Sequence, residues 1–104
     1  MSEIINLQGN IINRKDREQL ESFGGHTIAH GRATRWHWHK ADNGDDVFEI
    51  FRGGADEELA VCINRDRKTD AFYANDAIGN MVSSGALEHV MAELEQYFIE
   101  LHGE

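Results

Sequence analysis

The sequence contains no proline, a single cysteine, and no lysine or arginine after Lys68. Without proline, the chain has no proline-rich recognition tract and no stiff proline linker. One cysteine, Cys62, excludes an internal disulfide framework and a cysteine-rich zinc module, and it favours a reducing compartment. No apolar run approaches the roughly 20 residues of a membrane span, and residues 1–10 lack the features of a secretory signal. We therefore expect a cytoplasmic protein with no membrane segment.

The length of 104 residues predicts one domain over residues 1–104, with one core. Charge is distributed unevenly along it. Residues 1–52 hold 8 acidic and 7 basic side chains, a net of -1, whereas residues 53–104 hold 11 and 3, a net of -8. The second half should repel nucleic acid and anionic lipid and attract basic partners. A merely solvated acidic helix face is the alternative that charge alone leaves open.

The C-terminal segment has the period of an amphipathic helix. Ser83 or Ser84 can cap its N-terminus, and Gly103 lies where a helix normally ends. The expected helix covers residues 85–102, with apolar side chains at steps of three and four residues: Leu87, Val90, Met91, Leu94, Phe98 and Leu101.

The middle of the chain predicts short antiparallel strands separated by turn residues. Asn43-Gly44 is the strongest hairpin signal, because both residues tolerate positive φ. A short helix over residues 14–23, ended by Gly24-Gly25, precedes the strands. Short connections favour sequential neighbours. The predicted strands cover residues 32–41, 47–52, 59–64 and 70–74.

These elements predict the α+β class: a four-stranded antiparallel meander packed against the C-terminal helix, with a short N-terminal helix. The expected sheet core comprises Phe48, Ile50, Leu59, Val61 and Ile63. The other sheet face is too apolar to be fully wet, so either the sheet curls or that face binds a ligand or a second copy. Its expected residues are Val47, Phe51, Phe72 and, in one register, Trp36 and Trp38.

The stretch Trp36-His37-Trp38-His39 is the most unusual part of the sequence. On a strand, both histidines share one face and both tryptophans share the other. A plain two-residue turn would direct the histidines to the core, whereas a bulge would direct the tryptophans there, which we favour. His37 and His39 could then chelate a divalent transition metal or a small ligand, with Glu49 or His30 completing the site. A solvated histidine strand is the stronger interpretation.

No catalytic motif is found, so no catalytic residue is assigned and no cofactor is expected. The Arg-, Lys- and Trp-containing stretch could in principle stack nucleic acid, but the acidic charge disfavours it. The favoured function is a small acidic binding protein that masks a basic surface of a protein partner, as immunity proteins, antitoxins and anti-defence inhibitors do. A metal- or ligand-binding protein and a structural homodimer are the alternatives. The predicted partner-binding residues are Asp76, Glu88, Glu93, Glu95 and Glu100.

Overall fold

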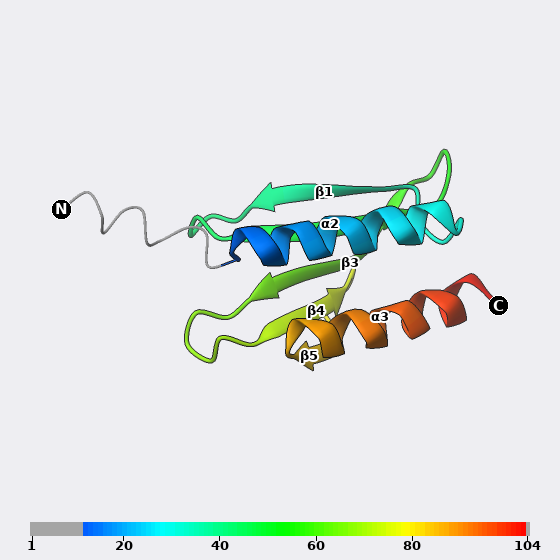
Figure 1. The fold of residues 1–104 in the computed structure, drawn as a ribbon. Coiled ribbons are helices and arrows are strands. Elements are labelled where there is room, and N and C mark those ends of the chain that lie inside the picture. The colour runs from blue at the N-terminus through cyan, green and yellow to red at the C-terminus, as the bar shows by residue number, and fades with distance from the viewer. Residues whose placement is uncertain (1–11, 104) are drawn as a thin grey trace.

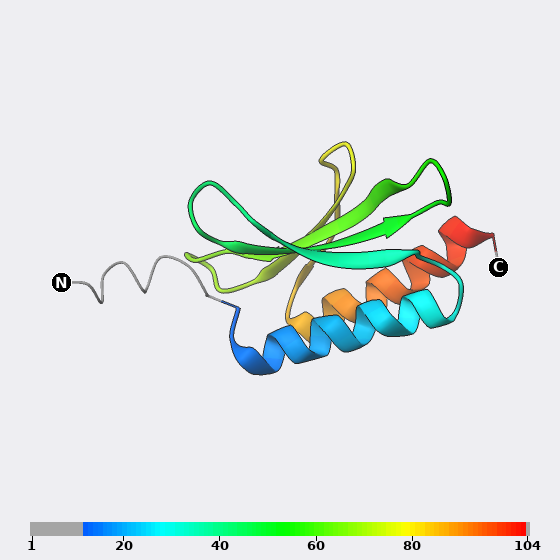
Figure 2. The same cartoon turned by 90° about the horizontal axis from the view of Figure 1, so that it is seen from above.

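The structure is a computed structural model that describes residues 12–103. Helix α2 (Arg14–Ala29) precedes five antiparallel strands, and helix α3 (Leu87–His102) follows them. Both helices lie side by side on one face of the sheet, and the other face is left uncovered (Figures 1 and 2). The α+β class is confirmed, with five strands where four were predicted. In sheet order, which is also chain order, the strands are β1 (Arg35–Lys40), β2 (Asp46–Arg52), β3 (Glu58–Arg65), β4 (Phe72–Asp76) and β5 (Met81–Gly85).

The additional strand is β5, which contains the two serines that we expected to cap the last helix. Ser83 pairs with Ala74 and Ser84 with Tyr73, so the capping prediction is wrong. The N-cap of α3 is Ala86, which makes no side-chain capping hydrogen bond. At the other end the prediction is confirmed, because α3 ends at Gly103 with a left-handed φ of 89°.

Helix α2 continues through Gly24-Gly25, where we expected it to end. Its start is fixed by Asn13, whose side chain accepts a hydrogen bond from the Asp16 backbone N–H at 2.8 Å. Gly24 is buried against the sheet. A Cβ atom there would lie 2.7 Å from Trp36 Cδ1 and 2.9 Å from Phe48 Cζ. Gly24 therefore permits close helix–sheet contact and does not terminate the helix.

The β1–β2 hairpin decides which aromatic residues reach the core. The Ala41 N–H donates to the Asp45 carbonyl at 2.8 Å, which leaves a three-residue loop with Gly44 at a φ of +91°. Trp36 pairs with Ile50 and Trp38 with Phe48. Our preference for tryptophans on the core face is confirmed, although neither of the two predicted registers is correct.

The core lies between the sheet and the two helices. Phe48, Ile50, Val61 and Ile63 are fully buried there, as predicted, and α3 supplies Leu87, Val90, Leu94 and Phe98. Two assignments are wrong. Phe72 is buried on this helix-covered face, and Leu59 is only half-buried, because bulges and pairing place it opposite Phe51 on the uncovered face.

A buried carboxylate holds α2 to the β1–β2 hairpin. Asp46 accepts a hydrogen bond from Arg17 at 3.0 Å and forms an ion pair with Lys40 at 2.8 Å. The Arg17 guanidinium also stacks on Trp38, whose indole N–H donates to Glu21 at 2.7 Å. Both tryptophans are half-buried on the helix-covered face, where they pack against Phe48.

Candidate functional site

The glutamates of α3 occupy two flanks of the helix. Glu93 and Glu95 are two residues apart, which places them about 160° apart around a helix of 3.6 residues per turn. Glu88 and Glu95 are separated by seven residues and share the flank that faces α2. Glu93 and Glu100 share the flank toward β5. The structure therefore does not bring the predicted acidic residues together on one surface.

The carboxylate of Glu93 is engaged within the fold. It accepts a hydrogen bond from Ser83 Oγ at 2.5 Å, and it lies 3.2 Å from His89 Nε2. Asp76 is also engaged, because its Oδ1 accepts the backbone N–H groups of Ile78 and Asn80 in the β4–β5 turn. The geometry gives these two residues contacts within the fold, although Asp76 also borders a smaller depression with Tyr97 and Leu101. Glu88 and Glu95 are the members that lie beside the concave surface between the two helices.

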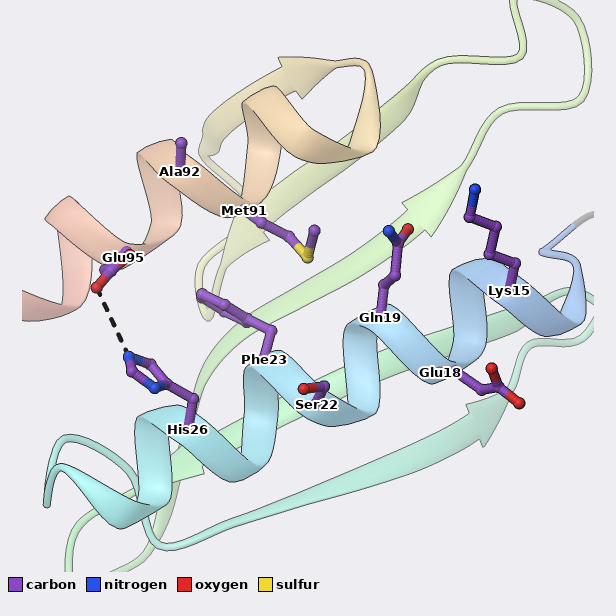
Figure 3. Close-up of a pocket in the computed structure, with 9 residues that line it drawn as sticks. All are labelled: Lys15, Glu18, Gln19, Ser22, Phe23, His26, Met91, Ala92 and Glu95. Atoms are coloured by element: carbon purple, nitrogen blue, oxygen red, sulfur yellow. Dashed lines mark ion pairs between the residues drawn. The ribbon is translucent and has the colours of Figure 1, made fainter.

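That surface is the groove between the two helices, which we call the α2–α3 groove. It has a volume of about 520 Å³. Figure 3 shows Phe23 of α2 and Met91 of α3 each extending into the space between the two helices, and both side chains are half-buried. The groove is lined by Lys15, Glu18, Gln19, Ser22, Phe23, His26, Met91, Ala92 and Glu95. It thus has an apolar floor between polar rims.

One rim of the groove is joined across the helices. His26 Nε2 lies 3.6 Å from a Glu95 carboxylate oxygen, and both side chains are about half exposed (47% and 49%). An ion pair this exposed contributes little stability. The Glu95 carboxylate can therefore leave His26 for another partner at little cost in free energy. Glu88 lies further along the same flank, in a neighbouring depression that Lys15 also borders. Glu88 and Glu95 can therefore contact one molecule seated along the groove.

The histidine pair lies on the opposite side of the molecule. His37 and His39 are exposed on the uncovered sheet face, where Glu49 is the cross-strand partner of His37. Among residues 12–103, no three histidine, cysteine, aspartate or glutamate side chains are grouped closely enough to hold a metal ion. The arrangement thus adds no support for the metal-binding alternative. His30, proposed as a further ligand, follows α2. Its ring centroid lies 4.3 Å from that of His26, and the two rings are tilted by 54°.

The pKa values of Cys62 and Tyr97 are both raised. Burial raises the pKa of the Cys62 thiol, and the negative charge of Glu49 raises it further. Burial also raises the pKa of Tyr97, with a smaller contribution in the same direction from Asp76. Both shifts keep the groups protonated at neutral pH. The half-buried Cys62 is therefore not an activated nucleophile.

No family model, curated protein or solved structure matches the chain. Neither helix in the described part of the chain has the length and apolar run that a membrane crossing needs.

The α2–α3 groove itself was not predicted. The periodicity placed Met91 in the core, and the expected end at Gly24-Gly25 removed His26 from the first helix. The spacing of Gln19, Phe23 and His26 by four and three residues is a helical signal that continues past the glycine pair. This period predicts a helix that extends to His26, with these three residues along one flank.

Proposed function

We propose that this chain is a small acidic, non-catalytic binding protein that masks a basic surface of a protein partner, in the manner of immunity proteins, antitoxins and anti-defence inhibitors. One observation supports this most directly. Helix α3 contains four glutamates and no lysine or arginine. One of them, Glu95, lines the α2–α3 groove, and a second, Glu88, borders the neighbouring depression on the same flank. The partner-facing members are Glu88 and Glu95. The other three predicted residues contribute at most to the long-range electrostatic field of the protein: Glu93, Glu100 and Asp76.

The form of the groove suggests which part of a partner it receives. An apolar floor formed by Phe23 and Met91 suits the apolar side of an amphipathic segment, as in other helix-in-groove contacts. Lysine or arginine side chains flanking that segment would reach Glu88 and Glu95. The proposed partner is therefore a protein that presents a basic amphipathic helix.

Masking would operate by steric occlusion, with electrostatics accelerating the encounter. A net charge of -9 attracts a basic surface before contact, so the association rate should fall as salt is added. Burial of apolar side chains in the groove would then determine the dissociation rate. Because electrostatics would govern association and apolar burial would govern dissociation, we expect the association rate to depend strongly on salt and the dissociation rate to depend weakly on it.

The proposal is tested with two double variants that carry the same change in charge. Glu88→Gln/Glu95→Gln neutralises the groove flank, and Glu93→Gln/Glu100→Gln neutralises the opposite flank. Each variant and the wild-type chain are immobilised and exposed to lysate of the source organism, and bound proteins are quantified by mass spectrometry. We expect a basic protein that the wild-type chain and the Glu93/Glu100 variant retain and that the Glu88/Glu95 variant loses by at least tenfold.

Binding kinetics of the captured protein complete the test. Equal loss in both variants would show that only total charge matters and would remove the groove from the proposal. A captured partner that is acidic, or whose association rate is independent of salt, would contradict the masking mechanism itself.

A further inference from the structure

The uncovered face of the sheet is the largest feature that the proposed function leaves unused. We call it the open sheet face. Its central row runs across all five strands through His37, Glu49, Cys62, Asn75 and Met81, as the cross-strand pairing shows. Both helices lie on the other side of the sheet (Figure 2). We propose that a second copy of this chain docks on the open sheet face and forms a weak symmetric dimer.

Charge is the first argument for a second copy. Two molecules that each carry a net charge of -9 repel one another over most approaches. The strand rows of the open sheet face carry one acidic residue, Glu49, and one basic residue, Arg35. Arg35 is paired with Glu57 at 2.7 Å, so the face together with Glu57 carries a net charge of -1, compared with -9 for the whole chain. Like-charge contact between two copies docked on this face is thus limited largely to their Glu49 side chains.

Exposed apolar side chains beside the face are the second argument. The β4–β5 hairpin rises on the side of the sheet away from the helices (Figure 2). It carries the two most exposed large apolar side chains of residues 12–103, Ile78 at 83% and Met81 at 60%. Met81 pairs with Asn75 of the central row, whereas Ile78 borders a depression that α3 also lines. No charged residue lies between Asp76 and Met81. The hairpin can thus contact a second sheet without burying a charge.

The available area sets the strength of the contact. Five strands spaced about 4.8 Å apart, with about five residues each at 3.3 Å, give roughly 400 Å² per copy. Two copies then bury about 800–1,000 Å² including the hairpins, which is below the standard size for stable complexes. The mixture of Val47, Phe51 and Tyr73 with histidine and asparagine is typical of a transient interface. We expect a dissociation constant of roughly tens to hundreds of micromolar.

Two amide-to-acid substitutions provide a matched test. Asn75→Asp places a negative charge at the centre of the open sheet face, and it does so twice in a symmetric dimer. Gln96→Glu makes the same change in charge on the exposed side of α3. Sedimentation velocity from 5 to 500 µM, in about 50 mM salt, measures the dimer dissociation constant of each variant. We expect Asn75→Asp to raise it at least fivefold and Gln96→Glu to change it less than twofold.

The alkylation rate of the Cys62 thiol provides an independent measurement of contact at the open sheet face. Because Cys62 lies in the central row, a second copy should shield it from iodoacetamide as the protein concentration rises. Protection should disappear in Asn75→Asp and persist in Gln96→Glu. A protein that stays monomeric to 500 µM with concentration-independent alkylation overturns the proposal and leaves the face to another partner or to solvent. A dimer weakened equally by both substitutions also overturns it, because the contact would then lie elsewhere.

Discussion

At the residue scale, Cys62 shows how one neighbour sets the chemistry of a side chain. Its thiol is half-buried on the open sheet face, with Glu49 as its direct cross-strand partner. Burial and the Glu49 carboxylate both raise the pKa of the thiol. Since only the thiolate attacks alkylating reagents, the raised pKa should make Cys62 slow to react at neutral pH.

The variant Glu49→Gln should speed the alkylation of Cys62. Removing the negative charge of Glu49 stabilises the thiolate and so lowers the pKa of the Cys62 thiol. At a pH below that pKa, a larger fraction of Cys62 is then present as the reactive thiolate. A pair of charges at cross-strand distance predicts an acceleration of about two- to threefold, after allowing for the lower nucleophilicity of a less basic thiolate. The rate is measured by mass spectrometry at pH 8 and 5 µM protein, where dimer is negligible.

Glu58→Gln is the matched control, because Glu58 is an exposed carboxylate at the start of the same strand. Its alkylation rate should equal that of the wild-type protein. If Glu49→Gln leaves the rate unchanged, burial alone sets the reactivity of Cys62.

At the scale of single elements, Gly24 and Gly25 of α2 allow the effect of packing on stability to be distinguished from the effect of helix propensity. Gly24 faces Trp36 and Phe48, whereas a Cβ atom at Gly25 would meet nothing within 4 Å. The two residues are adjacent in one helix, so their intrinsic propensities are the same. Only the sheet distinguishes them.

Substituting each glycine with alanine should therefore have opposite effects. Gly25→Ala should raise the free energy of unfolding by about 0.5–1 kcal/mol, because alanine is the better helix former. Gly24→Ala should lower it by about 1–3 kcal/mol, because its methyl group would overpack the contact with the aromatic rings. Urea unfolding followed by circular dichroism measures both. A stabilising Gly24→Ala would mean that α2 lies further from the sheet than described.

The same glycine pair shows where reading the sequence succeeds and where it fails. Helix α3 was predictable because its apolar period is carried by large residues such as Leu94 and Phe98, and Gly103 marks its end. The sequence predicts too short a helix for α2. A glycine that ends a helix cannot be distinguished, from sequence alone, from a glycine that makes room for a neighbouring aromatic ring. Strand β5 was not predicted because Ser83, although buried, has no apolar side chain. Its hydroxyl is satisfied by the hydrogen bond to Glu93.

The candidate site was less predictable than the fold, for a related reason. The sequence identifies glutamates in α3, but their function depends on which flank faces α2, and helix packing decides that. Glu95 became part of a groove only because His26 continues α2 beside it. Likewise, the three-residue loop after Ala41 sets which faces the tryptophans and histidines occupy.

At the scale of the whole molecule, the strands follow one another in the sheet in chain order, so most strand pairings close short loops. Such local topology favours fast folding. The absence of proline also removes the commonest source of slow isomerisation during folding.

We therefore expect refolding from urea to be complete within a second and to follow one exponential. Stopped-flow fluorescence reports it directly, because Trp36 and Trp38 are half-buried beside Phe48 and change environment on folding. The experiment is run at 2 µM, which avoids self-association. A major phase lasting tens of seconds would contradict this expectation.

The α2–α3 groove joins the first and the last described elements of the chain, with the whole meander between them (Figure 1). During synthesis, α2 and the early strands leave the ribosome before Met91 and Glu95 are available. A nascent chain can thus present much of the open sheet face while it has no groove at all. A partner that binds in the groove would distinguish a chain in which α3 has packed beside α2 from one that still lacks α3, so binding there would also report that the two helices are assembled on the sheet.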